Sequence, residues 1–208
     1  EEKETLYKAA LDHIATKYGN LPAGTQAWYL IAAWHVSKAQ QYDPLKSDSN
    51  RYAYVQAKGI CEKVIANRDS SEGKINCQNL LQEIHRKELN LQTEKVNVPD
   101  QPFRTLISYR NFTQLHFRLV KVDNKIREQL GNNSWQDDFW KKLLALPVIK
   151  TFSQTLPDTK DYQKHATEIK VDALPIGQYA LIASVNNDFS LGNTPLAVQY
   201  FYVSNIAY

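Results

Sequence analysis

The side chains that could support nucleophilic or metal chemistry in this chain are two cysteines and five histidines. Hydrolysis needs a nucleophile, a base and an orienting acid in one pocket, and the sequence offers no spacing that unites them. The seven glycines form no phosphate-binding loop. A pairing of His116 with His165 across a sheet domain would still lack further metal ligands. We therefore predict a non-catalytic chain with no cofactor and no metal site. The other histidines are His13, His35 and His85.

Cys61 and Cys77 lie on two segments that we predict to be consecutive antiparallel helices. The turn between them centres near Asp69, equally far from each cysteine, so the two thiols are expected level with each other. A disulfide is geometrically reasonable there, and a loop of this length would add roughly 3 kcal/mol of stability. The alternative is a pair of buried thiols in a reducing compartment. We favour the disulfide, which favours an exported protein, periplasmic or anchored at the cell surface.

Two short acidic clusters, Asp137–Asp138 and the stretch from Asp158 to Asp161, are the remaining candidates for ion binding. Both lie in predicted loops or at helix starts. Helix capping and solvation explain such clusters better than calcium binding. We therefore interpret them as structural and solvent-facing.

Composition narrows the possible partners. The apolar share is 43% and the formal net charge is +3, with basic residues spread along the chain, so we predict no nucleic-acid binding. No apolar run approaches the roughly 20 residues that span a bilayer, which predicts no transmembrane segment. The sequence contains no methionine and starts at Glu1. We expect it to be a piece of a longer parent chain, with the parent's neighbouring domains among its partners.

The first half, residues 1–88, has apolar residues at helical spacing, which predicts helices near 4–18, 23–41, 50–67 and 75–87. Trp28, Trp34 and Tyr52 belong to an aromatic cluster that is open to two interpretations. Such residues bind sugars or peptides on exposed surfaces, and they also fill the core of small helical units. We favour core packing and keep the three as candidate binding aromatics.

The second half, residues 89–208, changes to alternation of apolar and polar residues, which predicts seven strands. A helical insertion at about 123–146 interrupts them. The expected fold class is α+β in two units: N-terminal helical hairpins, then an antiparallel seven-stranded β-sandwich. The predicted strands are 90–96, 104–110, 114–121, 147–155, 167–173, 178–185 and 196–204.

Several segments of the second half carry a family resemblance when they are taken together: Tyr109-Arg-Asn-Phe-Thr-Gln-Leu-His-Phe-Arg118, Tyr162-Gln-Lys-His165, Glu168-Ile-Lys-Val171, Leu174-Pro-Ile-Gly-Gln-Tyr179 and Tyr202-Val-Ser-Asn-Ile206. They resemble a macroglobulin-type β-sandwich domain of the α2-macroglobulin family, in particular its large bacterial, Bacteroides-like members. In those members helical segments precede such domains, and the first half here is similar to tetratricopeptide repeats.

Members of this family trap proteases, and many carry an internal thioester in a Cys-x-Glu-Gln motif. That motif is absent here, since Cys61 precedes Glu62-Lys63 and Cys77 precedes Gln78-Asn79. The resemblance therefore implies a non-catalytic scaffold section of a protease-trapping protein, which meets proteases only through its intact parent. The alternative is a carbohydrate- or peptide-binding module of a bacterial cell-surface system.

Overall fold

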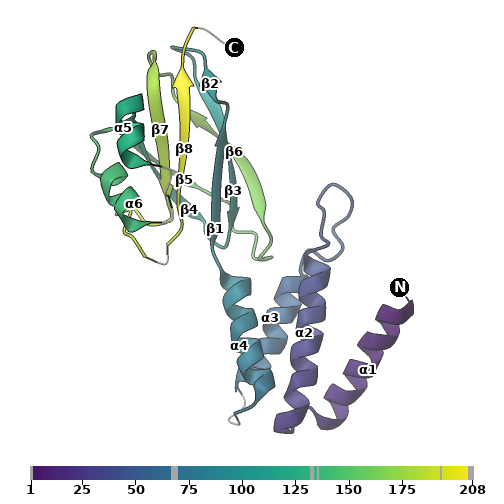
Figure 1. The fold of residues 1–208 in the computed structure, drawn as a ribbon. Helices are drawn as coiled ribbons and strands as arrows, with labels where there is room; N and C mark the ends of the chain where they lie inside the picture. The colour runs from purple at the N-terminus through teal and green to yellow at the C-terminus, as the bar shows by residue number, and fades with distance from the viewer. Residues whose placement is uncertain (1, 67–69, 132–133, 135, 193, 206–208) are drawn as a thin grey trace. The chain divides into compact units, whose positions relative to one another are not determined.

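The computed structural model describes residues 2–66, 70–131, 134, 136–192 and 194–205. The chain is α+β, with helices in its first part and two β-sheets in its second (Figure 1). It divides into two compact units. The helical unit comprises residues 1–86 together with 159–163, and the sheet unit comprises residues 87–158 and 164–208.

In the helical unit, small side chains lie where the helices contact one another. Ala32 and Ala57 are fully buried, as are Cys61 and Cys77, so the helix backbones approach closely around a thin core. Tyr54 and Ile84 close this core. The elements are α1 (Glu2–Tyr18), the 3-10 turn η1 (Pro22–Gly24), α2 (Thr25–Ala39), α3 (Ala53–Ala66) and α4 (Glu72–His85).

Helix α4 begins at a polar cap that also ties it to α2. Ser71 accepts a hydrogen bond from the Lys74 backbone N–H, and its hydroxyl lies 2.8 Å from that of Thr25. A Cβ atom on Gly73 would lie 2.4 Å from the Thr25 carbonyl carbon. The start of α4 therefore requires glycine, because any side chain there would collide with backbone.

Residues 159–163 belong to the helical unit although they follow β5 in sequence, and Asp161 is their anchor. Its carboxylate is fully buried and accepts hydrogen bonds from Arg51 Nε at 3.1 Å, Thr159 Oγ1 at 2.9 Å and the Gln163 backbone N–H at 3.0 Å. The Gln163 amide donates to the carbonyls of Ala39 and Arg51. The prediction that Asp161 is solvated was wrong, because these donors replace water around the charge.

The sheet unit contains two sheets that share one hydrophobic core. One has the order β1-β3-β6 and the other β2-β8-β7-β4-β5 (Figure 1). The elements are β1 (Glu88–Thr93), β2 (Val96–Asn97), β3 (Phe103–Arg110), β4 (Gln114–Lys121), α5 (Asn124–Leu130), α6 (Asp137–Leu144), β5 (Val148–Thr155), β6 (His165–Val171), β7 (Gly177–Ser184) and β8 (Leu196–Val203).

The middle strands of the five-stranded sheet, β7 and β4, are covered on both faces, whereas the edge strand β5 is largely exposed. Phe117, Leu181 and Phe201 face the core shared with the other sheet. On the opposite face, Ile182 packs in a second core with Leu143 of α6 and with other side chains of the helical insertion. Strand β7 is consequently buried on nearly its whole length. The helical insertion therefore covers the outer face of the sheet.

The structure refines the predicted strand count and pairing. The seven predicted strands correspond to β1 and β3–β8, but an eighth, the two-residue β2, was missed. It pairs in parallel with β8, so the sheets are not purely antiparallel. A two-residue strand carries no detectable alternation in sequence, which explains the omission. The predicted insertion contains two helices, α5 and α6.

The Leu174-Pro-Ile-Gly-Gln-Tyr179 segment forms the predicted connection between β6 and β7. The Tyr179 hydroxyl donates a hydrogen bond to the Pro175 carbonyl at 2.9 Å. A Cβ atom on Gly177 would lie 3.1 Å from the Tyr179 ring. Glycine is favoured at this position because the ring folds back over the backbone.

Candidate functional site

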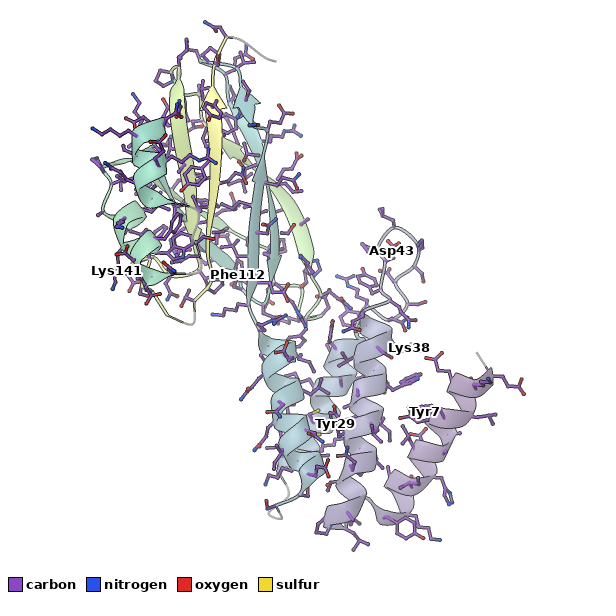
Figure 2. The ribbon with its side chains drawn as sticks, viewed as in Figure 1. Tyr7, Tyr29, Lys38, Asp43, Phe112 and Lys141 are labelled. Atoms are coloured by element: carbon purple, nitrogen blue, oxygen red, sulfur yellow. The ribbon has the colours of Figure 1, made fainter. Side chains whose placement is uncertain are left out.

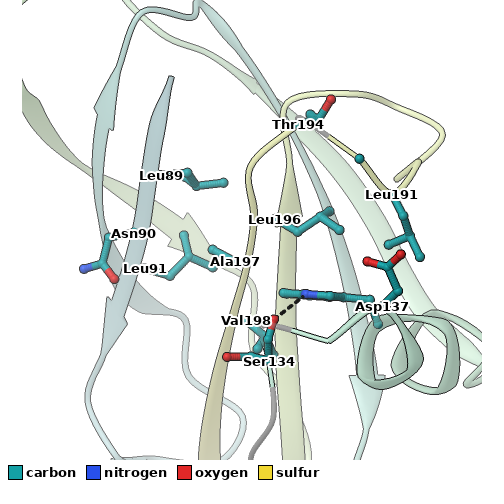
Figure 3. Close-up of a pocket in the computed structure, with 12 residues that line it drawn as sticks. Leu89, Asn90, Leu91, Ser134, Asp137, Leu191, Thr194, Leu196, Ala197 and Val198 are labelled. Carbon is teal, nitrogen blue, oxygen red and sulfur yellow. Dashed lines mark hydrogen bonds between the residues drawn. The ribbon is translucent and has the colours of Figure 1, made fainter. Parts of the chain in front are cut away.

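A cavity of about 370 Å³ lies along the first residues of β8 in the sheet unit (Figure 3). Strand β1, the segment that precedes β8 and the start of α6 surround it. The lining residues are Leu89, Asn90, Leu91, Ser134, Asp137, Trp140, Leu191, Gly192, Thr194, Leu196, Ala197 and Val198. We call this cavity the β8 pocket.

The β8 pocket extends over both faces of β8. Ala197 packs against the core between the sheets, on the side of Leu89 and Leu91 of β1. Leu196 and Val198 pack against the second core, on the side of Trp140. Successive side chains of a strand point to opposite faces, so the pocket reaches around the edge of the strand. Figure 3 shows the start of β8 between the two groups.

Among the residues that the structure describes, the backbone of β8 has a partner strand on one side only along this stretch. Strand β7 pairs with β8 from Leu196 to Val203, whereas β2 reaches only Tyr202 and Val203 on the other side. The Tyr202 N–H donates to the Lys95 carbonyl at 2.8 Å, so it points away from β7. Since the register runs without a shift, the N–H and carbonyl of Val198 point the same way.

Trp140 shapes the pocket but does not offer its ring for stacking. The indole is 9% exposed and meets Phe139 edge to face. Its N–H donates to the Ser134 carbonyl at 2.8 Å. The tryptophan therefore ties Ser134 to the second core, and its polar atom is already used.

Asp137 is the one ionisable side chain among the residues that line the pocket. It lies in the first turn of α6, where a negative charge is favoured by the helix dipole. Neither a histidine nor a cysteine lines the pocket with it, so these residues hold no acid–base pair and no activated nucleophile. Within the described part of the chain, no group of three or more His, Cys, Asp or Glu could hold a metal ion.

Tyr200 lies farther along β8, with its hydroxyl buried and lacking a hydrogen-bond partner in the part of the chain that the structure describes. Burial raises the pKa of this hydroxyl. The Arg127 guanidinium lies 4.5 Å from the centre of the ring. Tyr200 is therefore held as a neutral phenol under α5.

The structure places Cys61 and Cys77 together in the core of the helical unit as free, buried thiols. A hydrogen bond with Cys77, followed by burial, raises the pKa of the Cys61 thiol. A thiol with a raised pKa is a poor nucleophile, so Cys61 is not activated for attack. The disulfide between them stays a prediction.

The three candidate binding aromatics do not form one site. Trp28 is half-buried between two cores and borders a hollow of about 260 Å³. Trp34 and Tyr52 line a second hollow of about 340 Å³ with Lys38, which Figure 2 labels at the end of α2. The Nζ atom of Lys38 lies 5.4 Å from the centre of the Trp34 ring, and Arg51 lies 5.3 Å from that of Tyr52.

The basic groups of this second hollow already have acidic partners. Lys38 pairs with Glu4 at 2.7 Å, and Arg51 pairs with the buried Asp161. Cations also lie against the rings, where a sugar would have to stack. The hollow therefore has less to offer a ligand than the β8 pocket, which the sequence did not point to.

Comparisons with known proteins give a weak picture of relatedness. No family model and no curated protein matches the chain. Among solved structures, a CARDB domain from Pyrococcus furiosus, crystallised with two metal ions, is 10% identical with a TM-score of 0.32 and covers 56% of this chain and 91% of that one. A solution structure of the same domain is 9% identical with a TM-score of 0.32, and it covers 57% of this chain and 94% of that one. The soluble domain of PmoD from a Methylocystis species is 12% identical with a TM-score of 0.28, and it covers 57% of this chain and 90% of that one.

Sequence reasoning missed the β8 pocket because its residues come from three separated segments. The alternation of Leu89 and Leu91, and Asp137 at a helix start, were visible signals. Their meeting depends on how the sheets and the insertion pack. In the described residues no helix is long and apolar enough to cross a membrane.

Proposed function

We propose that this chain is a non-catalytic module that binds a protein segment in the β8 pocket. The observation that carries the proposal is the pocket's position along a strand edge that has no partner strand in the described part of the chain. A binding role needs shape and a few polar groups, which Asp137 and Thr194 supply beside apolar side chains.

Two features favour a protein segment over a carbohydrate. Sugar sites usually offer an exposed aromatic face, whereas Trp140 is buried and its N–H is already bonded. The exposed backbone of β8 is complementary to another polypeptide backbone. Of the two alternatives within the binding-module interpretation, the peptide is therefore the better supported.

The test is a comparison of ligand classes on the full chain. A displayed library of random twelve-residue peptides and an array of glycans would be screened with the wild-type chain and with Ala197→Arg, which places a long charged side chain in the pocket. Ile176→Arg is the control, since Ile176 is 59% exposed and does not line the pocket. Peptide enrichment that Ala197→Arg abolishes and Ile176→Arg preserves supports the proposal. Glycan binding without peptide enrichment contradicts it.

The narrower role, a scaffold section of an α2-macroglobulin-like protease trap, is a second proposal that rests on the sequence resemblance alone. It is tested on the intact parent. A protease incubated with the parent should lose activity on a large protein substrate and keep activity on a small peptide. Equal activity on both substrates would remove the trap hypothesis and leave the binding proposal intact.

A further inference from the structure

We propose that the β8 pocket takes an extended, basic peptide segment by β-strand addition to the free edge of β8, with Asp137 selecting a lysine or arginine. This inference rests on the proposed binding function and specifies its ligand and its geometry. Three observations lead to it.

The first observation is the direction of the backbone groups. The N–H groups of Tyr202 and Ser204 donate to carbonyls of Lys95 and Asn97, on the side of β8 away from β7. Alternation along the strand puts the N–H and carbonyl of Val198 on that same side. Strand β2 already pairs along this line at Tyr202 and Val203. An added strand would continue this line along the start of β8, in the pocket that Leu89 and Leu91 of β1 also line.

A side-chain contact supports this direction. The Tyr200 carbonyl accepts a hydrogen bond at 3.1 Å from the side-chain amide of its neighbour Gln199. An amide side chain thus provides the kind of donor that a neighbouring strand would provide. A ladder that began at β2 and continued past this point would replace that local bond with a backbone bond of the same type.

The second observation is that the pocket lies on both faces of the strand edge. A strand laid beside β8 sends alternate side chains to opposite faces. On one face they meet Leu89, Leu91 and Ala197, which favour an apolar side chain. On the other they meet Leu196, Val198 and Asp137. A ligand bound by side chains alone would need only one of these faces.

The third observation is charge. Asp137 is the one ionisable group among the lining residues, and it is exposed at the pocket. A basic side chain on the Asp137 face complements it, whereas an acidic one is repelled. Because the pair stays near solvent, its contribution is modest, and we expect about a threefold preference.

The experiment uses the full chain and synthetic heptapeptides in which valine and lysine alternate between terminal threonines. Binding is measured by titration calorimetry and by the exchange of backbone amides in NMR. We expect the amides of Val198 and Tyr200 to become protected on binding, while amides that already donate to β7 change little. The valine–glutamate version of the peptide should bind about threefold more weakly, since the ion pair is partly exposed.

Two N-methylated forms of the peptide decide the binding mode. One is methylated on the valine nitrogens and the other on the lysine nitrogens. In an added strand only one set of N–H groups faces β8, so one form should lose roughly tenfold or more in affinity while the other binds nearly normally. Equal losses, or unchanged exchange at Val198, would overturn strand addition.

Two protein variants separate the parts of the proposal. Asp137→Asn should remove the preference for lysine over glutamate and keep binding. Val198→Pro should remove the outward N–H and weaken every peptide, since proline at an edge spares the pairing with β7. The fold of this variant is checked by its amide spectrum, in which the signals of β4 should be unchanged.

If random peptides select the pocket but none of these effects appears, the binding function stands and strand addition fails. If no peptide binds at all, both fail.

Discussion

The two units of this protein obtain their stability from different kinds of contact. The sheet unit buries large apolar side chains on both faces of its five-stranded sheet, as Phe117 and Leu143 show. The helical unit packs alanines and two thiols where its helices meet, with larger side chains such as Tyr54 and Ile84 around them, and it adds a buried carboxylate, Asp161, with several donors. The difference indicates that the stability of the sheet unit depends on the volume of its buried apolar side chains. The stability of the helical unit depends on close approach of the helix backbones and on hydrogen-bonded buried polar groups.

The largest expected effect tests the dependence of the sheet unit on volume. Phe117 is 1% exposed and stacks on Phe152 with ring centres 4.6 Å apart. Phe117→Ala should lower the free energy of unfolding by about 3–5 kcal/mol, because it leaves a cavity between the sheets. The free energy of unfolding is measured by urea denaturation, with the exchange of backbone amides in β4 and β7 as the probe. Leu106→Ala is the control, since Leu106 is 37% exposed; a similar loss there would contradict the argument from volume.

A disulfide would strengthen the helical unit by constraining the unfolded chain. Oxidation with oxidised glutathione transfers two electrons and two protons from Cys61 and Cys77 and should stabilise the unit by roughly 3 kcal/mol. Mass analysis without reductant should show the loss of two protons, and the unfolding midpoint should rise. Cys77→Ser serves as the control. Two free thiols after complete exposure to the oxidant would contradict the predicted disulfide and the exported location inferred from it.

The buried carboxylate tests the polar part of the comparison. Asp161→Ala removes an acceptor from Thr159, Gln163 and Arg51 while leaving their donors in place, so we expect a loss of about 2–3 kcal/mol. Asp158→Ala is the matched control, since Asp158 lies in the same acidic cluster but is exposed. Thermal unfolding measured by circular dichroism in the helical region reports the change. Equal effects of the two variants would show that burial of the charge is unimportant.

The smallest expected effect is a dependence of the free energy of unfolding on pH. Burial, and secondarily the Lys8 ammonium, lower the pKa of His35 below 6.5, against an opposing contribution from Asp12. The unfolded chain therefore takes up a proton before the folded one as the pH falls through 6.5, and the free energy of unfolding should decrease in that range. His35→Gln should flatten this part of the pH profile. A profile unchanged by the substitution would remove His35 as its cause.

The sequence by itself determined the fold class and the approximate positions of the longer elements. Periodicity is a local property, so the alternation of Leu115, Phe117 and Leu119 predicted β4, and helical spacing predicted α2 and α3. Even the insertion was visible from its apolar spacing. Short β2 was not visible, because its existence depends on a neighbour rather than on a pattern.

Only the tertiary structure decided which residues meet. The burial of Asp161 depends on a long-range return of the chain to Arg51, and the β8 pocket depends on three segments that converge at one strand edge. Neither leaves a local pattern in the sequence. Strand addition to β8 follows from pairing on one side only, and that property belongs to the arrangement of strands rather than to any stretch of residues.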